Sequence, residues 1–353
     1  MTRAARNGLV VGVTGAAGQL GAAVAGALVL SEGVRQVIGL DTVRPAVPGV
    51  TWRRADPTDP ALAGGLRGID ALVHLAMDLD PGSDRAVQRT TNNRGASIAL
   101  TAAAAASVRR VVLVTSARVY GAHPDNPVPL PEDAPLRAQP ENTVLGDLLD
   151  IEQLAARARS AYPGVSVSVV RPALLLGPGF EHAAAGLLDG PRLLAVRGAR
   201  PHWQFCHVED LGSAVATVLH AGLDGPLTVA CDGWLEQVEL ERALDRRRIE
   251  LPAPVAFGTA ARLHAIGVST PPSELSYLVH PWVVSSQRLR QAGWRPAHSN
   301  LEALAEYVAG RPVGPRRLRI DAKGATAAAG ATVALVGTAA LIRRARQRRR
   351  RGM

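Results

Sequence analysis

Residues 9–30 read LVVGVTGAAGQLGAAVAGALVL and decide the fold of this 353-residue chain. The apolar run at 9–14 predicts a strand, and the Ala/Leu/Val-rich pattern over 19–30 predicts a helix. Between them lies a turn with glycines at Gly15, Gly18 and Gly21. A second apolar run, QVIGLD, ends at Asp41. Strand, glycine turn, helix and strand within this length predict a βαβ unit.

The same alternation continues along the chain. It predicts strands at 51–56, 69–76, 111–116, 165–172 and 227–233, and helices at 93–106, 147–161 and 211–221. Short strands that alternate with helices indicate an α/β fold, a doubly wound parallel sheet of the Rossmann type. We predict a dinucleotide-binding domain over 1–172. Residues 173–310 form a small C-terminal substrate-binding cap interleaved with returning sheet elements, and 311–353 form a tail.

The glycine turn favours a dinucleotide cofactor. Glycines allow a diphosphate to approach the backbone N–H groups at a helix N-terminus, where the helix dipole attracts anions. Asp41 lies twenty residues after Gly21, where a carboxylate accepts hydrogen bonds from the adenosine ribose and repels a 2′-phosphate. The pattern therefore predicts NAD rather than NADP, although Arg44 leaves NADP open.

Charge and cysteine content exclude several other classes. The formal net charge of +10 arises in residues 311–353, where eleven arginines and one lysine face one aspartate for +11, so residues 1–310 carry −1. The nearly neutral charge of residues 1–310 therefore argues against a nucleic-acid partner for the folded body. Two cysteines without metal-ligand spacing argue against a disulfide scaffold and a zinc module, and no metal site is expected. We expect a cytoplasmic protein, because the N-terminal apolar run is too short for a signal peptide.

Several landmarks follow the glycine turn in a fixed order. The spacing GxxGxxG and these landmarks resemble the extended short-chain dehydrogenases/reductases, and specifically the UDP-glucose 4-epimerase-like members of the NAD-dependent epimerase/dehydratase group. The resemblance covers about residues 9–310. The residues that show the resemblance are Asp56 in RADPTD, HLA at 74–76 and Asn93 in NNRGA. Three longer segments resemble family motifs: TSARVYG at 115–121 resembles SSxxVYG, RPALLLGPG at 171–179 resembles RPxNVYGPG, and HVEDLGSAV at 207–215 resembles HVDDxAxAV.

The resemblance implies a set of functional residues. It implies NAD as the cofactor and a small-molecule substrate, a nucleotide sugar or a related hydroxyl-bearing molecule, held between the sheet and the cap. It leaves a homodimer open. The implied catalytic residue is Ser116, and the implied cofactor-binding residues are Gly15, Gly18, Gln19, Leu20, Gly21, Asp41, Asp56, Leu75, Ala76, Asn93 and Pro172.

One part of the family pattern is missing. The family uses a YxxxK pair, in which the lysine lowers the pKa of the tyrosine so that the phenolate takes a proton from the substrate hydroxyl. Counting back from Glu152 in the DIEQL segment places Val144 at the tyrosine position and Leu148 at the lysine position. No shift of register restores the pair, because Lys323 is the only lysine of the chain.

Three interpretations of this gap remain open. The base has moved to Asp147, Tyr120, His123 or His207; or the protein binds its cofactor without catalysis; or the substrate supplies its own acid or base. Each candidate base also has a structural interpretation, as a solvated helix acid, a packed ring or a buried turn histidine. The alternative to an epimerase/dehydratase-type oxidoreductase is therefore a non-catalytic, NAD-responsive binding or scaffold protein.

The tail suggests a membrane surface. Residues 324–342 are uncharged and mostly Ala, Gly and Thr, and an arginine cluster follows them. A span would conflict with a cytoplasmic cofactor domain, because the arginines also favour that side. We therefore expect a helix at the inner face of the membrane, attracted to anionic lipid, and leave a disordered soluble tail as the alternative.

Overall fold

The central element is a seven-stranded parallel sheet with the strand order β11-β6-β5-β4-β1-β2-β3. The computed structural model describes residues 8–80, 83–178, 180, 188, 192–265 and 271–310. The chain starts in the middle of the sheet, runs to one edge through β2 and β3, and then crosses to β4 on the other side of β1. The strands of the sheet are β1 Leu9–Thr14, β2 Val34–Asp41, β3 Val50–Arg54, β4 Ala71–His74, β5 Arg110–Val114, β6 Ser166–Pro172 and β11 Gly225–Val229.

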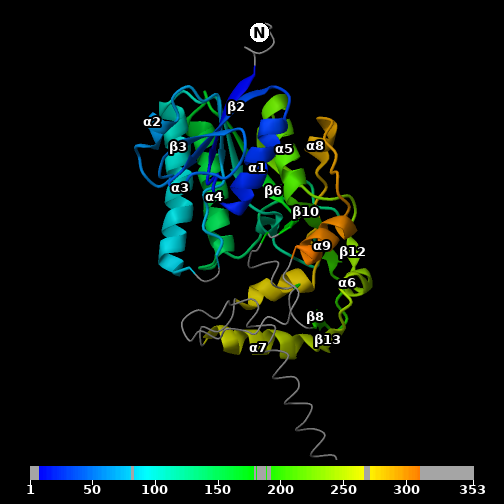
Figure 1. The fold of residues 1–353 in the computed structure, drawn as a ribbon. Coiled ribbons are helices and arrows are strands. Elements are labelled where there is room, and N and C mark those ends of the chain that lie inside the picture. The colour runs from blue at the N-terminus through cyan, green and yellow to red at the C-terminus, as the bar shows by residue number, and fades with distance from the viewer. Residues whose placement is uncertain are drawn as a thin grey trace, which may run out of the picture.

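Helices cover both faces of this sheet (Figure 1). Helices α3 (Arg85–Ala105) and α4 (Val144–Ala161) pack together on one face, while α1 (Gln19–Leu30) and α5 (Val208–Ala221) pack together on the other. The short α2 (Leu62–Gly65) contacts α3. A parallel sheet needs this double cover, because the crossover connections place apolar side chains on both of its faces. The predicted doubly wound α/β fold is confirmed.

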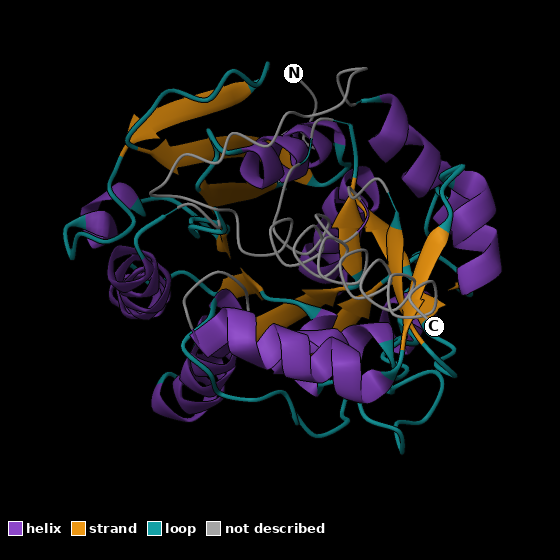
Figure 2. Cartoon of the chain, turned by 90° about the horizontal axis from the view of Figure 1, so that it is seen from below, coloured by secondary structure: helices purple, strands orange, loops and turns teal. Residues whose placement is uncertain are grey.

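The C-terminal half adds smaller elements, most of which lie beyond the carboxyl ends of the strands. Three two-stranded sheets pair β7 with β10, β9 with β12 and β8 with β13, and α7 lies with β8 and β13 below the main sheet (Figures 1 and 2). The elements are β7 Leu174–Leu176, β8 Leu193–Val196, β9 His202–Trp203, β10 Phe205–His207, β12 Leu235–Glu236, α6 Gln237–Ala243, β13 Arg248–Leu251, α7 Ala253–Ala265, the 3-10 helix η4 Pro272–Leu278, α8 Gln287–Gln291 and α9 Asn300–Ala309.

Three predicted helices start earlier than the sequence indicated. The helix predicted over 211–221 begins at Val208, where the His207 side chain accepts the Glu209 N–H. The helix predicted over 93–106 begins at Arg85, because the Asp84 side chain accepts hydrogen bonds from the backbone N–H groups of Ala86 and Val87. Its first two turns are polar, so no apolar periodicity marks them. The helix predicted over 147–161 begins at Val144, where the Thr143 hydroxyl accepts the Gly146 N–H. All three starts are set by N-caps, which satisfy otherwise unpaired N–H groups.

A polar pair lies inside the sheet. Thr14 and His74 are register partners on β1 and β4, and the Thr14 hydroxyl lies 2.8 Å from Nδ1 of His74. His74 is buried, and burial lowers its pKa to about 4. An exposed histidine in the unfolded chain titrates at about 6.5, so the unfolded chain binds this proton more readily than the folded one. The stability that follows is present above pH 6.5 and is lost as the pH falls toward 4.

We expect the His74→Gln variant to show a flatter loss of stability in acid. One proton taken up only by the unfolded chain changes the free energy of unfolding by up to about 1.4 kcal/mol per pH unit. Urea unfolding at about pH 7 and about pH 5 measures this slope. The exposed His264→Gln on α7 is the matched control and should keep the wild-type slope. Equal slopes for His74→Gln and wild type would contradict the account.

Candidate functional site

The turn between β1 and α1 brings two loops of the sheet together through glycines. Gly15 has a φ of 70°, and a Cβ there would lie 2.8 Å from the backbone of Leu75 and Ala76. A Cβ on Gly21 would lie 2.0 Å from the carbonyl oxygen of Gly15. Neither approach is possible for a larger residue, since real Cβ atoms do not come this close to backbone. The implied residues of the turn and of the HLA loop therefore form one surface.

The N-terminus of α1 opens at this surface. Its N-cap is Gly18, and no side chain caps the helix. Gly18 and Gln19 are exposed, whereas Leu20 and Gly21 are buried. An uncapped helix N-terminus presents N–H groups and a partial positive charge, which suit a diphosphate. A Cβ on Gly18 would meet only the Gly15 carbonyl oxygen, at 3.3 Å, and this exposed residue leaves the N–H groups of the turn accessible, so the residues present fit a dinucleotide.

Asp41 borders the same turn from the end of β2. Its carboxylate accepts hydrogen bonds from the backbone N–H of Ala17 at 3.0 Å and of Val43 at 3.1 Å. Both bonds fix the side chain next to the glycine turn. This position agrees with a carboxylate that meets the ribose of an adenosine beside the turn.

Asp56 and Asn93 are engaged elsewhere. The Asp56 carboxylate accepts the N–H and hydroxyl of Thr58, and these bonds lower the pKa of Asp56. The Asn93 amide donates to Asp150 on α4 at 2.9 Å. Neither contact involves the glycine turn, so their contact with a cofactor stays a prediction.

Asn92, which the sequence interpretation passed over, lies against the loop after β4. It is buried, its carbonyl oxygen accepts the Asp78 N–H at 2.7 Å, and its amide donates back to the Asp78 carbonyl. The family pattern NVxGT has its asparagine three residues before the glycine, which is Gly95 here. That count selects Asn92 and could have identified it from the sequence.

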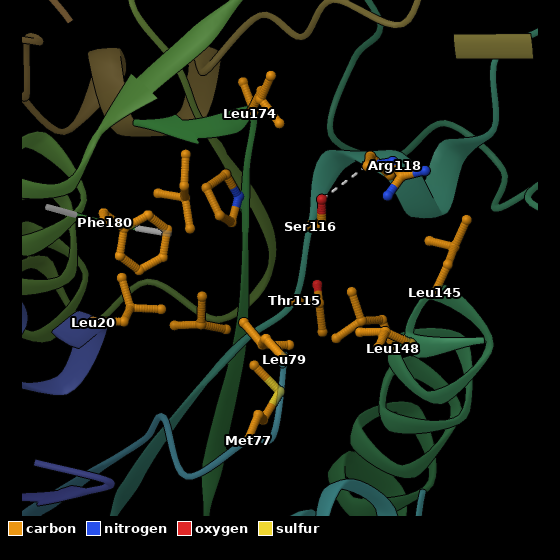
Figure 3. Close-up of a pocket in the computed structure, with 15 residues that line it drawn as sticks. Leu20, Met77, Leu79, Thr115, Ser116, Arg118, Leu145, Leu148, Leu174 and Phe180 are labelled. Carbon is orange, nitrogen blue, oxygen red and sulfur yellow. Dashed lines mark hydrogen bonds between the residues drawn. The ribbon is translucent and has the colours of Figure 1, made fainter. Parts of the chain in front are cut away.

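A cavity lies beside the glycine turn, between the ends of β5 and β6 and the first turns of α4 (Figure 3). Ser116 faces it, with Leu145 and Leu148 on one side and Leu174 and Phe180 on the other. The Ser116 oxygen accepts the Arg118 N–H at 3.3 Å, so its own O–H can donate to a ligand. The described residues that line the cavity are Leu20, Met77, Leu79, Val114, Thr115, Ser116, Arg118, Val144, Leu145, Leu148, Pro172, Ala173, Leu174, Leu175 and Phe180.

Val144 and Leu148, at the positions expected for the proton-transfer pair, line this cavity. They stand one turn apart at the start of α4, in the same cavity as Ser116. Neither side chain can take or give a proton. The described lining thus keeps the hydroxyl of Ser116 and presents hydrocarbon where the family pattern has a phenol and an ammonium.

Asp147 does not replace the missing base. It is buried, and the Arg85 guanidinium donates to both of its oxygens at 2.8 and 2.5 Å. The Asn92 amide adds a third hydrogen bond at 3.0 Å. A carboxylate held by this bidentate pair is directed toward Arg85 on α3. Asp147 therefore joins α3 to α4 and does not line the cavity.

Tyr120 is also committed to the protein interior. Its hydroxyl donates to the Glu132 carbonyl at 2.9 Å and accepts from Arg171 at 2.7 Å. Burial raises the pKa of Tyr120 to about 12. A phenol with this pKa and these partners is a poor base near neutral pH.

The two histidine candidates lie outside the described cavity lining. His123 has Nε2 at 3.2 Å from the Arg137 carbonyl oxygen and lines a separate pocket. His207 caps α5, with Nδ1 accepting the Glu209 N–H, and its ring lies 3.8 Å from that of His298. Burial, followed by the neighbouring His298, lowers the pKa of His207.

The surroundings of His207 also bear on metal binding. His207, Glu209 and His298 place ligand atoms within 4.8 Å of one another. In the neutral ring, however, Nδ1 of His207 already accepts a hydrogen bond, so Nε2 carries the proton. This arrangement leaves His207 no lone pair for a cation.

An ion pair holds α4 against the sheet next to the cavity. Arg171 on β6 donates to both oxygens of Glu152 on α4 at 2.8 Å, and the Thr115 hydroxyl donates to Glu152 at 2.7 Å. All three side chains are buried. The first turns of α4, which carry Val144 and Leu148, are positioned by this network.

The geometry agrees with comparisons to known proteins. The family model for the NAD dependent epimerase/dehydratase family matches residues 11–229, and the chain belongs to this family. An uncharacterised protein of Mycobacterium tuberculosis is 30% identical over 324 residues, which cover 87% of this chain and 85% of that protein. The predicted family is therefore confirmed.

Solved structures share the fold. The UDP-glucose 4-epimerase of Thermus thermophilus, in complex with NAD, matches with a TM-score of 0.63 and 20% identity over 86% of this chain and 98% of that one. DesIV of Streptomyces venezuelae, a dTDP-glucose 4,6-dehydratase with NAD and TYD bound, matches with a TM-score of 0.62 and 23% identity over 86% and 96%. These identities establish a common fold.

We expect the Asp41→Ala variant to narrow the preference for NAD(H) over NADP(H). Removing the carboxylate removes both an acceptor for ribose hydroxyls and a charge that repels a 2′-phosphate. Calorimetry of wild type and variant with both cofactors measures the change, with about 1.4 kcal/mol for each tenfold change in affinity. The exposed Asp224→Ala in the loop before β11 is the control. Tighter binding of NADP(H) by the wild type would contradict the assignment.

Proposed function

We propose that this protein binds NAD(H) at the glycine turn and holds a hydroxyl-bearing ligand beside Ser116, without the proton-transfer pair of its family. The observation that carries the proposal is the juxtaposition of Ser116, Val144 and Leu148 in one cavity next to the turn. Family membership, the uncapped α1 N-terminus and the position of Asp41 support the cofactor. Of the interpretations left open by the sequence, this geometry favours cofactor binding with little or no ordinary turnover.

The residues divide between cofactor and ligand. The glycine turn would hold the diphosphate and Asp41 the adenosine ribose, while Leu20, in the first turn of α1, and Pro172, at the end of β6, line the cavity. Bound NAD supplies a hydride acceptor. Ser116 orients a ligand hydroxyl through its O–H, and Val144 and Leu148 exclude water from that hydroxyl. No described side chain of the cavity offers a base to remove its proton.

We expect turnover of UDP-sugars, dTDP-sugars and sterols to be absent or very slow. General acid–base catalysis contributes about 10² to 10⁴-fold, and that part of the rate enhancement is missing. NADH fluorescence and product chromatography measure the residual rate. Turnover at an ordinary enzyme rate, of about 1 s⁻¹ or faster, would contradict the proposal, and Asp147→Asn would then be the first variant to examine.

The paired Val144→Tyr and Leu148→Lys substitutions provide the converse test. The two positions are one helical turn apart and share the cavity with Ser116, so a phenol and an ammonium can meet there. We expect the double variant to raise any residual hydride transfer by more than either single variant. Leu149→Lys, one position along α4, is the control and should produce no gain.

The second candidate function is an epimerase/dehydratase-type oxidoreductase acting on a nucleotide sugar. Family membership and the hydroxyl of Ser116 favour it. It requires a ligand that supplies its own acid or base, because the described lining has none. Turnover of a nucleotide sugar in the assays above would select it.

The expected membrane contact of the tail falls on residues 311–353, which lie outside the described part of the chain. Among the helices of the described part, none has the length and apolar character of a membrane span. We propose that the tail attaches the protein to anionic lipid at the inner face of the membrane. Its +11 charge against −1 for residues 1–310 supports this, since each arginine near such a leaflet contributes about 1 kcal/mol before screening.

Flotation with liposomes tests the tail. We expect the full chain to float with anionic but not neutral vesicles and to dissociate as salt rises, because exposed charges are screened over about 8 Å at physiological ionic strength. A chain ending at Gly310 should stay unbound and keep its NAD affinity. Equal flotation of the two chains, or none by either, would refute the attachment, and preferential binding to DNA would revive a nucleic-acid partner.

A further inference from the structure

The part of the cavity that surrounds Ser116 is apolar on both sides. From this we infer that the ligand is an apolar alcohol, a mostly hydrocarbon molecule with one hydroxyl such as a terpenoid alcohol, rather than a nucleotide sugar. The inference rests on the proposed function, because it names the ligand class of the same site.

Apolar side chains come from two separate elements. Leu145 and Leu148 project from α4 on one side of Ser116, and Val144 at the start of the same helix also lines the cavity. Leu174 on β7 and Phe180 after it stand on the other side. Leu174 occupies the place that asparagine has in the RPxNVYGPG pattern, so a family amide is replaced by hydrocarbon at the cavity wall.

The polar side chains of the described lining are already engaged, apart from the Ser116 O–H. Thr115 donates its hydroxyl to Glu152. Arg118 forms an ion pair with Glu274, and its guanidinium lies 4.4 Å from the centre of the Tyr277 ring. The Tyr277 hydroxyl donates to the Arg118 carbonyl at 2.6 Å. The one charged side chain of the described lining is thus neutralised and fixed.

The one unengaged side-chain donor of the described lining, the Ser116 O–H, can pair with a single hydroxyl of a ligand. A hexose has several hydroxyls, and each one buried without a partner weakens binding. A diphosphate would have to compete with Glu274 for Arg118. A hydrocarbon skeleton instead gains by leaving water for the leucines and Phe180. The single donor of Ser116 then fixes the end that carries the hydroxyl.

Equilibrium dialysis of the NAD-saturated full chain tests the inference, with radiolabelled farnesol and UDP-glucose as probes. We expect farnesol to bind at least about tenfold more tightly than UDP-glucose. The hydrocarbon farnesane, which lacks the hydroxyl, should bind about 2- to 12-fold more weakly than farnesol. Ser116→Ala should remove that difference between farnesol and farnesane.

Substitutions at Leu174 test whether farnesol binds in the cavity beside Ser116. Leu174→Asn should weaken farnesol binding by about tenfold, because it places an amide without a partner in the apolar wall. Leu174→Met keeps the volume and should change the affinity by less than about threefold. Leu30→Asn, at a position 87% exposed on α1, should leave it unchanged.

The possible outcomes separate the two proposals. Preference for UDP-glucose, equal binding of both probes, or binding of neither would overturn the apolar ligand while NAD(H) binding stands. Farnesol binding that Leu174→Asn and Ser116→Ala both leave unchanged would also overturn it, since the ligand would lie elsewhere. Failure to bind NAD(H), measured separately by calorimetry, would instead defeat the proposed function itself.

Discussion

The close approach of backbone at the first β-α turn is the constraint on which the site depends. Gly21 lies so near the Gly15 carbonyl that a Cβ on it would come within 2.0 Å of the oxygen. A Cβ on Gly15 would likewise lie 2.8 Å from the backbone of Leu75 and Ala76. This contact fixes where α1 begins and how close the loop after β4 comes to it. The edge that would receive the dinucleotide is therefore built from glycines that allow no side chain.

A second, independent constraint holds the ligand side of the site. The buried Arg171–Glu152 pair, completed by the Thr115 hydroxyl, joins β5, β6 and α4. Removing one partner would leave an uncompensated buried charge, so a substitution of Arg171 or Glu152 alone would strongly destabilise the fold. The network positions the helix that carries Val144 and Leu148, but neither of these side chains takes part in its hydrogen bonds. The frame of an oxidoreductase can therefore persist while the side chains that move protons are replaced by hydrocarbon.

The sequence predicts the fold well, because strand alternation and the glycine turn are local signals. It also places Val144, Leu148 and Ser116 together, since counting along a motif gives helix register. It predicts less about the candidate bases: Asp147 looks available from its helix position, yet Arg85, sixty-two residues away, binds both of its oxygens. Side-chain pairing across the fold leaves no local pattern. Nor could composition show that Leu174 and Phe180 would face Leu145 across one cavity.

The central claim is that this chain keeps a working NAD(H) site next to a cavity without a proton-transfer pair. Native mass spectrometry of the full chain, incubated with equal amounts of NAD and NADP, tests its first half most directly. The account predicts one NAD per chain and little NADP, with that preference reduced in Asp41→Ala. A spectrum with no bound nucleotide, or with NADP as the main adduct, would contradict it.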